Sequence, residues 1–367
     1  MTTEKILLLD TNIPGNTMRV AKNKAAPLMP GFTRPGTYVR PYKFHYVLYG
    51  GGFGDYCCYT RAFEWIYENC PHVAPVFYYP KFMTDFAYYF FGDRRRCSIE
   101  NNEQCVADDW DPKSPFIAPY RAGVTQFISP QGAHPLRLGF AYYSNQIDIP
   151  DGYDNYPEID LSDDGLPKEL KTLSYAVIAP GAVRKTGTVP GRFWNPIIKF
   201  LNSNGVTPVI LGKSSMTNGY HAKLPEGIEA DSTINLWDQT PMALDAARII
   251  QYAKVVIGLD NGLLHLAGCT KAPIVFGHNV ANIKLRRPIR KVGKIVDVFI
   301  PREELGCTFC LTDIKCHYMW EFNNNCLYEH VDKLPHPKCI DMLFEDNGRR
   351  WKNAIDEALE QPTTEGK

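Results

Sequence analysis

The sequence predicts an α/β protein built from two doubly wound domains. Its 367 residues exceed what one hydrophobic core ordinarily supports, since single cores stop growing at roughly 250–300 residues. Apolar runs of strand length alternate with helical periodicity in two separate parts of the chain, residues 44–79 and 174–280. Strand, helix and strand in succession are typical of a parallel sheet covered by helices. We therefore expect two such sheets.

The first predicted domain begins with an apolar strand that runs directly into a glycine-rich turn. The strand HYVLY, residues 45–49, precedes GGGFG at residues 50–54. The helix expected after this turn carries apolar side chains at helical spacing, namely Tyr59, Phe63, Ile66 and Tyr67. A second strand, APVFYYP, covers residues 74–80. We expect this domain to span residues 1–165, of which 1–43 form an irregular, proline-rich arm.

The second predicted domain, residues 172–345, alternates strands and helices more regularly. We expect its strands at residues 174–179, 206–211, 254–259 and 272–276. We expect its helices at residues 192–205, 241–253 and 263–270. A polar segment, residues 159–170, is the expected linker between the domains. Doubly wound sheets bind ligands beyond the carboxyl ends of their strands, so the turns after these strands form the expected site.

Composition and charge exclude several classes of protein. The chain has 44% hydrophobic and 22% charged residues, as folded globular proteins do. Its 40 basic and 40 acidic residues cancel, so a nucleic acid or a membrane would have to bind a local patch. The N-terminal apolar run, residues 6–9, is too short for a signal peptide, and no run approaches the roughly 18 residues of a membrane span. We therefore expect a cytoplasmic protein without a transmembrane segment.

One turn in the second domain has the composition of an anion site. The strand VVIGL ends in Asp260, Asn261 and Gly262, and His265 follows one turn into the next helix. Unpaired N–H groups at a helix start attract anions, and His265 adds a further donor. Asp260 could order the turn or accept a hydrogen bond from a sugar hydroxyl. The alternative is a helix cap beside a buried histidine.

Cations follow the first strand of the same domain. The segment APGAVRKTGTVPGRFW places Gly181 directly after the strand, then Arg184 and Lys185, with Arg192 at the start of the next helix. Gly212, which follows the second strand, would lie at the same edge of the sheet. This edge would suit a diphosphate, and the alternative is a solvated loop.

The glycine-rich turn of the first domain ends in an acid. The sequence GGGFGD fits G-x-G-x-x-D, so the third glycine of the dinucleotide fingerprint is absent and NAD binding is disfavoured. Gly51, Gly52 and Gly54 would let a second molecule approach the backbone closely. Asp55 would stand at the N-terminus of the next helix, where the helix dipole stabilises a carboxylate that can accept a proton. The alternative is that Asp55 only caps the helix.

Three segments together resemble glycosyltransferase family 9, the lipopolysaccharide heptosyltransferase family. They are GGFGDYCCYTRAFEWI, the region from APGA to PVILG, and AKVVIGLDNGLLHLAGCTKAPIVFG, and the resemblance covers residues 44–345. It implies a GT-B fold, in which two Rossmann-like domains face each other across a deep cleft. It also implies inverting transfer of a sugar from a nucleotide-diphosphate donor, and a C-terminal helix within residues 346–367 that packs back on the N-terminal domain. No metal-binding motif lies near the expected site, so we expect metal-independent transfer in which cationic side chains replace a metal.

Residue roles follow from the resemblance by position. The family's catalytic base, the aspartate of a Gly-Asp turn, matches Asp55, and the glycine turn before it would then hold the acceptor. The family's D-x-G-x-x-H motif, which binds the phosphates and sugar of the donor, matches residues 260–265. Its phosphate-contacting cation matches Arg184 or Lys185. Because the loop is longer here and lacks the usual Lys-x-Trp-Pro, Arg192 stays an alternative.

Two further segments carry weaker signals. The run from Lys284 to Lys294 holds six cations and no acid. It would bind a phosphorylated glycolipid, a lipid headgroup or a nucleic acid, or form a solvated loop. Near the C-terminus, cysteines recur at metal-ligand spacing, at Cys307, Cys310, Cys316 and Cys326. They could hold a structural zinc, form a disulfide or stay unliganded thiols.

The resulting hypothesis is an inverting glycosyltransferase with a nucleotide-sugar donor and a glycan or glycolipid acceptor, as in surface-glycan synthesis. No cofactor is expected to be required for catalysis. One alternative is a phage-type glycosyltransferase that modifies a nucleic-acid base, which the basic run alone supports. Another is a non-catalytic nucleotide-sugar-binding protein. The expected location is the cytoplasm, with the inner membrane face as an alternative.

Overall fold

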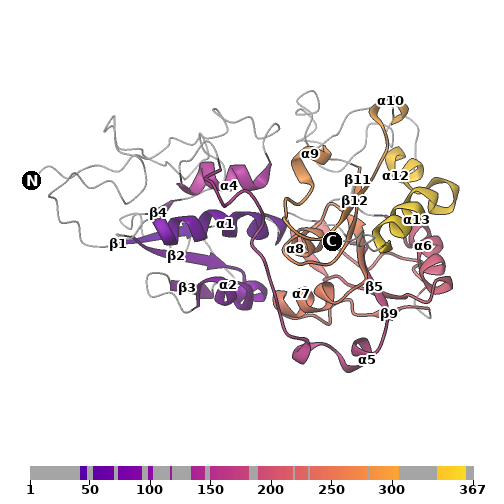
Figure 1. The fold of residues 1–367 in the computed structure, drawn as a ribbon, viewed down its shortest axis with the longest axis horizontal. Helices are drawn as coiled ribbons and strands as arrows, with labels where there is room; N and C mark the ends of the chain where they lie inside the picture. Colours follow the sequence, from indigo (N-terminus) through magenta and orange to yellow (C-terminus); the bar gives the residue numbers. More distant parts are fainter. Residues whose placement is uncertain are drawn as a thin grey trace, which may run out of the picture. The chain divides into compact units, whose positions relative to one another are not determined.

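The computed structural model divides the chain into two compact units (Figure 1). Unit 1 comprises Met1–Pro157 and Met242–Leu244, and unit 2 comprises Glu158–Pro241 and Asp245–Lys367. The structure describes residues 42–47, 53–69, 73–92, 98–101, 116–117, 134–144, 149–181, 189–217, 220–229, 232–279, 282–305 and 337–360. Each unit contains a parallel sheet with helices, so the predicted α/β class is confirmed.

Unit 1 is built on a four-stranded parallel sheet in the order β3-β2-β1-β4. Its strands are β1 (Tyr42–Val47), β2 (Val73–Tyr79), β3 (Ser98–Asn101) and β4 (Phe116–Ile117). The first two are the strands predicted from the apolar runs on either side of the first helix. They pair in parallel, with Tyr42 opposite Val73, because a helix separates them along the chain.

The helices of unit 1 bury the predicted apolar face. They are α1 (Phe53–Asn69), α2 (Thr84–Phe91) and α4 (Pro135–Ser144), with a short 3₁₀ turn η1 (Lys81–Met83) before α2. Along α1, Tyr59, Phe63 and Ile66 are buried, as their spacing predicts. Helix α4 packs on α1 at Gly139, where an added Cβ would lie 2.7 Å from the Tyr59 ring. A glycine at this position therefore allows the two helices to approach closely.

Unit 2 contains a six-stranded parallel sheet in the order β12-β11-β10-β5-β6-β9. Its strands are β5 (Tyr175–Ala179), β6 (Thr207–Ile210), β9 (Ile234–Asn235), β10 (Val255–Leu259), β11 (Ile274–His278) and β12 (Ile295–Phe299). The four predicted strands are β5, β6, β10 and β11. Strands β5, β10 and β11 are buried at every residue, as strands covered on both faces must be. Strands β9 and β12 and the hairpin of β7 (Ser215–Thr217) and β8 (Tyr220–Ala222) were not predicted.

The helices of unit 2 include the three that periodicity predicted, α6 (Gly191–Ser203), α7 (Ala243–Gln251) and α8 (Gly262–Gly268). The others are short, apart from the last: η2 (Asp163–Gly165), α5 (Lys168–Lys171), α9 (Ile283–Arg286), α10 (Arg302–Leu305), α12 (Lys338–Leu343) and α13 (Glu345–Leu359). Among the described residues, no helix combines the length and hydrophobicity needed to cross a bilayer.

The segment expected as a linker is an ordered part of unit 2. Gln251, at the end of α7, exchanges two hydrogen bonds with the backbone of Leu161, at 2.9 and 2.8 Å. The hydroxyl of Tyr252 donates to the same carbonyl at 2.8 Å. The amide of Ile159 donates to the carbonyl of Cys269 at 2.7 Å. Polar composition suggested a linker here, but these contacts tie residues 159–161 to the helices beside them.

Helix α13 corrects one prediction. It was expected to pack back on the N-terminal domain, but its apolar face is buried in the core of unit 2, against α6 and β12. Trp351 is fully buried, with ring centroids 5.0 Å from Phe344 and 5.5 Å from Trp194. An added Cβ at Gly277 of β11 would lie 2.4 Å from the Trp351 ring, so the indole rests directly on the sheet. The apolar face of α13 therefore packs against the sheet and α6 of its own unit.

Candidate functional site

Asp55 lies in the first turn of α1, directly after Gly54. Its side chain is partly exposed. This is the local position that the sequence predicts for the general base. Gly51 and Gly52 lie outside the described residues. The roles of Asp55 and of the glycine turn stay predictions.

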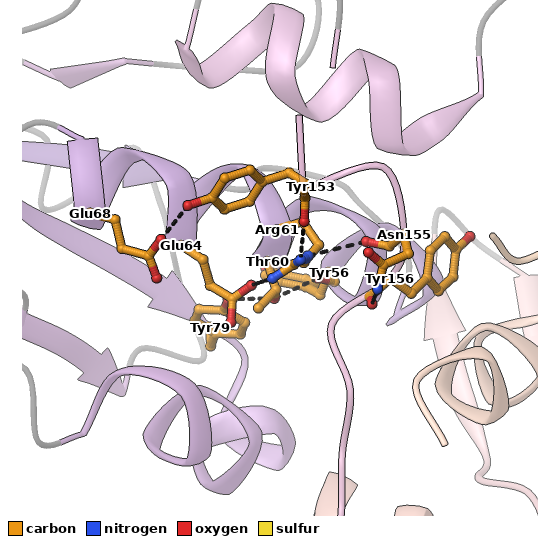
Figure 2. A network of polar contacts seen from close by, with 10 residues as sticks. Tyr56, Thr60, Arg61, Glu64, Glu68, Tyr79, Tyr153, Asn155 and Tyr156 are labelled. Carbon is orange, nitrogen blue, oxygen red and sulfur yellow. Dashed lines mark hydrogen bonds and ion pairs between the residues drawn. The ribbon is translucent and has the colours of Figure 1, made fainter. Parts of the chain in front are cut away.

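A polar network fixes the helix that carries Asp55 (Figure 2). Arg61 of α1 donates to the carbonyls of Gly152 and Asn155, at 2.8 and 3.2 Å. Its guanidinium also pairs with Glu64 at 2.6 Å and lies 4.9 Å from the centroid of the Tyr153 ring. The segment 152–155 is thereby bound along α1.

The same network continues into the interior of unit 1 (Figure 2). The hydroxyls of Thr60 and Tyr79 are 3.0 Å apart, so α1 is joined to the end of β2. The Cys58 thiol donates to the Tyr156 hydroxyl at 2.9 Å. Burial raises the pKa of Tyr79 well above its ordinary value, so this hydroxyl stays neutral. These contacts hold α1 rigidly, which a positioned base requires.

In unit 2, the turn between β10 and α8 is organised by Asn261. Its side-chain oxygen accepts from the backbone N–H groups of Leu263 and Leu264, at 3.0 and 3.2 Å. Its amide nitrogen donates to the carbonyls of Ala179 and Gly181, at 3.0 and 3.1 Å. Asn261 therefore caps α8 and joins the turns after β10 and β5. This corrects the expectation that the first-turn N–H groups of α8 are free for an anion, since two of them bond the cap.

Beside this cap, Asp260, His265 and Arg286 form a charged group that we call the Asp260 cluster. His265 Nε2 lies 3.0 Å from Asp260 Oδ1, and Arg286 Nε lies 3.9 Å from Asp260 Oδ2. His265 is buried and both Asp260 and Arg286 are largely buried. This contact places two of the predicted donor-binding residues together, and their role in donor binding stays a prediction. The sequence placed Arg286 in the basic run and not among the donor-binding residues. Its contact with Asp260 shows that it lies beside this turn.

A second histidine lies at the end of the neighbouring strand. His278 is the last residue of β11, and its Nε2 lies 2.8 Å from Oδ1 of Asp297 in β12. The other carboxylate oxygen of Asp297, Oδ2, pairs with Arg287 Nε at 2.9 Å. The His278 ring stacks on Phe276 with centroids 4.6 Å apart, and Phe276 meets the His265 ring edge-on at 6.1 Å. These rings support the Asp260 cluster from the side of β11. The pair could not be predicted from the sequence, because β12 was not predicted.

The two predicted donor-binding glycines, Gly181 and Gly212, lie under the indole of Trp237. An added Cβ would be 2.5 Å from this ring at Gly181 and 2.0 Å at Gly212. Trp237 Nε1 donates to Ser214 Oγ at 3.0 Å, and Ser214 donates in turn to the Asp238 carboxylate at 2.6 Å. The absence of side chains at 181 and 212 is therefore required by Trp237, whatever ligand binds here.

We expect Gly212→Ala to destabilise the protein by about 1–3 kcal/mol, because the new methyl overlaps the Trp237 ring. The shift of the urea unfolding midpoint measures this. In a Trp237→Ala background, the ring is gone and the same substitution should cost less than about 0.5 kcal/mol. An equal penalty in both backgrounds would contradict the packing described.

The structure brings together only part of the predicted donor site. Gly181, residues 260–262 and His265 meet at the carboxyl edge of β5 and β10, as predicted. Arg192 is exposed at the start of α6, with its guanidinium 4.9 Å from the centroid of the adjacent Phe193 ring. Arg184 and Lys185 lie outside the described residues, and so do four cysteines predicted as metal ligands, Cys307, Cys310, Cys316 and Cys326.

One segment of the chain matches a known protein family, and it contains the carboxyl edge of β5 and β10. Residues 129–296, just under half of the chain, match the profile of glycosyltransferase family 9 (heptosyltransferase). The match includes the Asp260 cluster, Asn261 and Trp237. The resemblance seen in the sequence is confirmed for this segment. A search of curated proteins gave no match.

Solved structures with low sequence identity share the fold. One is the iron-containing dodecameric glycosyltransferase TibC from enterotoxigenic E. coli H10407, with a TM-score of 0.61 and 14% identity over 87% of this chain and 76% of TibC. TibC is also known in complex with ADP-D-beta-D-heptose. Another is a family 9 glycosyltransferase from Veillonella parvula DSM 2008, with a TM-score of 0.54 and 9% identity over 88% of this chain and 99% of that protein. The likeness confirms the predicted fold class.

Proposed function

We propose that the chain is a glycosyltransferase that moves a sugar from a nucleoside-diphosphate donor to an acceptor hydroxyl. The observation that carries the proposal is the Asp260 cluster, a buried Asp–His pair with an arginine, within a segment that matches glycosyltransferase family 9. The ADP-heptose bound by TibC supports a sugar nucleotide as the donor.

On the donor side, unit 2 offers groups that suit a diphosphate. Arg286 supplies a cation beside the turn, and Gly262 lets a ligand approach the backbone. The bond between Asp260 and His265 holds both side chains in place beside this turn. Lys185, Arg184 or Arg192 would add a further cation. These groups would stabilise the charge that develops on the diphosphate as it leaves.

On the acceptor side, Asp55 would act as the general base. As the acceptor oxygen forms a bond to the anomeric carbon, its proton passes to the Asp55 carboxylate. The bond between the anomeric carbon and the diphosphate breaks, and the diphosphate leaves with the electron pair. Attack from the face opposite the leaving group inverts the anomeric configuration. We propose that side-chain cations take the place of a metal ion, so activity should survive chelation by EDTA.

Two other functions remain as alternatives. A nucleotide-sugar-binding protein without activity would keep the Asp260 cluster but would not need Asp55. A glycosyltransferase acting on a nucleic-acid base would need a basic surface. Four of the six cations in the run from Lys284 to Lys294 contact acids or backbone carbonyls within unit 2, namely Arg286, Arg287, Arg290 and Lys294. Among the described residues, only Lys284 and Lys291 of this run make no such contact, which is few for a nucleic-acid surface and favours the glycan acceptor.

A thermal-shift screen over nucleoside-diphosphate sugars tests the proposal. A donor present at 100 times its Kd stabilises the folded protein by about 2.7 kcal/mol and raises its melting temperature. His265→Ala should abolish the shift, whereas Asp151→Asn, an exposed acid of unit 1, should keep it. The proposal fails if no sugar nucleotide raises the melting temperature, or if His265→Ala leaves the shift unchanged.

A further inference from the structure

Unit 2 has a pocket that the proposed transfer does not use. Its volume is about 530 Å³, and it is formed by α9, the loop after it and β12. The residues that line it are Ile283, Lys284, Arg287, Pro288, Ile289, Arg290, Gly293, Ile295 and Asp297. The lining thus combines cations with branched aliphatic side chains, which is the composition expected for an amphipathic anion.

The pocket carries an excess of positive charge. Lys284, Arg287 and Arg290 line it against one acid, Asp297, which already pairs with Arg287 at 2.9 Å. Arg290 donates to the carbonyls of three residues on the α8 side, the nearest at 2.8 Å, but its buried Nε has no hydrogen-bond partner among the described residues. Burial and the charge of Arg287 lower the pKa of Arg290 to about 10. An anion in the pocket would relieve this repulsion.

The rim of the pocket adds exposed apolar and basic side chains. Ile289 is 37% exposed and Val292 is 39% exposed, on the loop between α9 and β12. Lys284 and Lys291 are exposed and make no ion pair with any described residue. No acid occurs between residues 283 and 296. Exposed aliphatic side chains among cations favour the boundary between lipid headgroups and acyl chains.

We propose that this pocket and its rim dock unit 2 on an anionic membrane surface. The phosphate of an anionic phospholipid would lie among Lys284, Arg287 and Arg290, and the side chains of Ile289 and Val292 would enter the headgroup layer. Single-stranded nucleic acid is a poorer fit, because residues 283–296 contain no aromatic side chain on which a base could stack. The docking is peripheral and does not depend on the sugar-transfer chemistry.

Vesicle flotation of the full chain tests this proposal. We expect binding to vesicles of phosphatidylcholine and phosphatidylglycerol in equal amounts, but not to phosphatidylcholine alone, and a decrease with added salt. Each cation strengthens binding to an anionic surface roughly fivefold, so Lys284→Glu with Lys291→Glu should weaken partitioning by about 25-fold or more. Ile289→Ser with Val292→Ser should also weaken it, at unchanged melting temperature.

The matched control is Lys168→Glu with Lys223→Glu, which reverses two exposed lysines of unit 2 that do not line the pocket. It should leave vesicle binding within about twofold of the original protein. The proposal is overturned if the protein does not bind anionic vesicles. It is also overturned if the control variant loses as much binding as Lys284→Glu with Lys291→Glu. It is also overturned if the protein binds glycerol phosphate but not vesicles. The same holds if Lys284→Glu with Lys291→Glu abolishes binding of the protein to a DNA column but not to vesicles.

Discussion

Replacing Asp55 with Asn should lower the rate of sugar transfer by about 10²–10⁴-fold, the usual contribution of a general base. The amide matches the carboxylate in size but cannot take the proton from the attacking hydroxyl. Donor binding should not change, since the residues expected to hold the diphosphate lie on unit 2. Release of nucleoside diphosphate from the sugar nucleotide identified by thermal shift measures the rate, and calorimetry measures the affinity.

Asp151→Asn is the control for this substitution, because it removes an exposed carboxylate from the same unit. Its rate should stay within about twofold of that of the original protein, as substitutions of exposed residues usually have small effects. If Asp55→Asn retains full turnover, Asp55 only caps α1. A loss of donor affinity without a loss of turnover would likewise show that its role has been misassigned.

The substitution Trp351→Ala should destabilise the protein by about 3–5 kcal/mol, as truncation of a buried tryptophan generally does. Its ring is fully buried between α6 and the sheet, against Trp194 and Phe344. Urea unfolding followed by circular dichroism measures the loss. Because single mutations of this size consume much of a protein's stability, the expressed variant is best studied at low temperature.

Asn353→Ala provides a control on the same helix, since Asn353 is exposed two residues further along α13. Its effect should stay within about 0.5 kcal/mol. A small effect of Trp351→Ala, comparable with that of Asn353→Ala, would mean that α13 is not part of the core of unit 2.

Local patterns predicted the parts of the fold that depend on short stretches of sequence. The strands β5, β6, β10 and β11 are mostly apolar runs, and α6 carries a distinct apolar face, so these patterns are sufficient to predict them. Strand β12 was missed because Asp297 interrupts its apolar run. Only the tertiary partners of that carboxylate, His278 and Arg287, explain a charge in this strand.

The candidate site was predictable where its residues share one turn. Asp260 and His265 are five positions apart, and their contact follows from a strand that leads into a helix. Trp237 could not be predicted, because it reaches Gly181 and Gly212 from a separate part of the chain. One signal was available: two glycines after neighbouring strands leave room that a large side chain must fill. The placement of α13 failed for a similar reason, since an amphipathic helix does not specify its partner.

Hydrogen exchange with and without the sugar nucleotide from the thermal-shift screen tests the central claim most directly. The claim is that the edge of unit 2 around the Asp260 cluster holds the donor. It predicts slower amide exchange in residues 258–268 and 282–287 when the donor is bound, with little change in α13. Saturating binding that leaves both of these segments unprotected, and protects other parts of the chain instead, would contradict it.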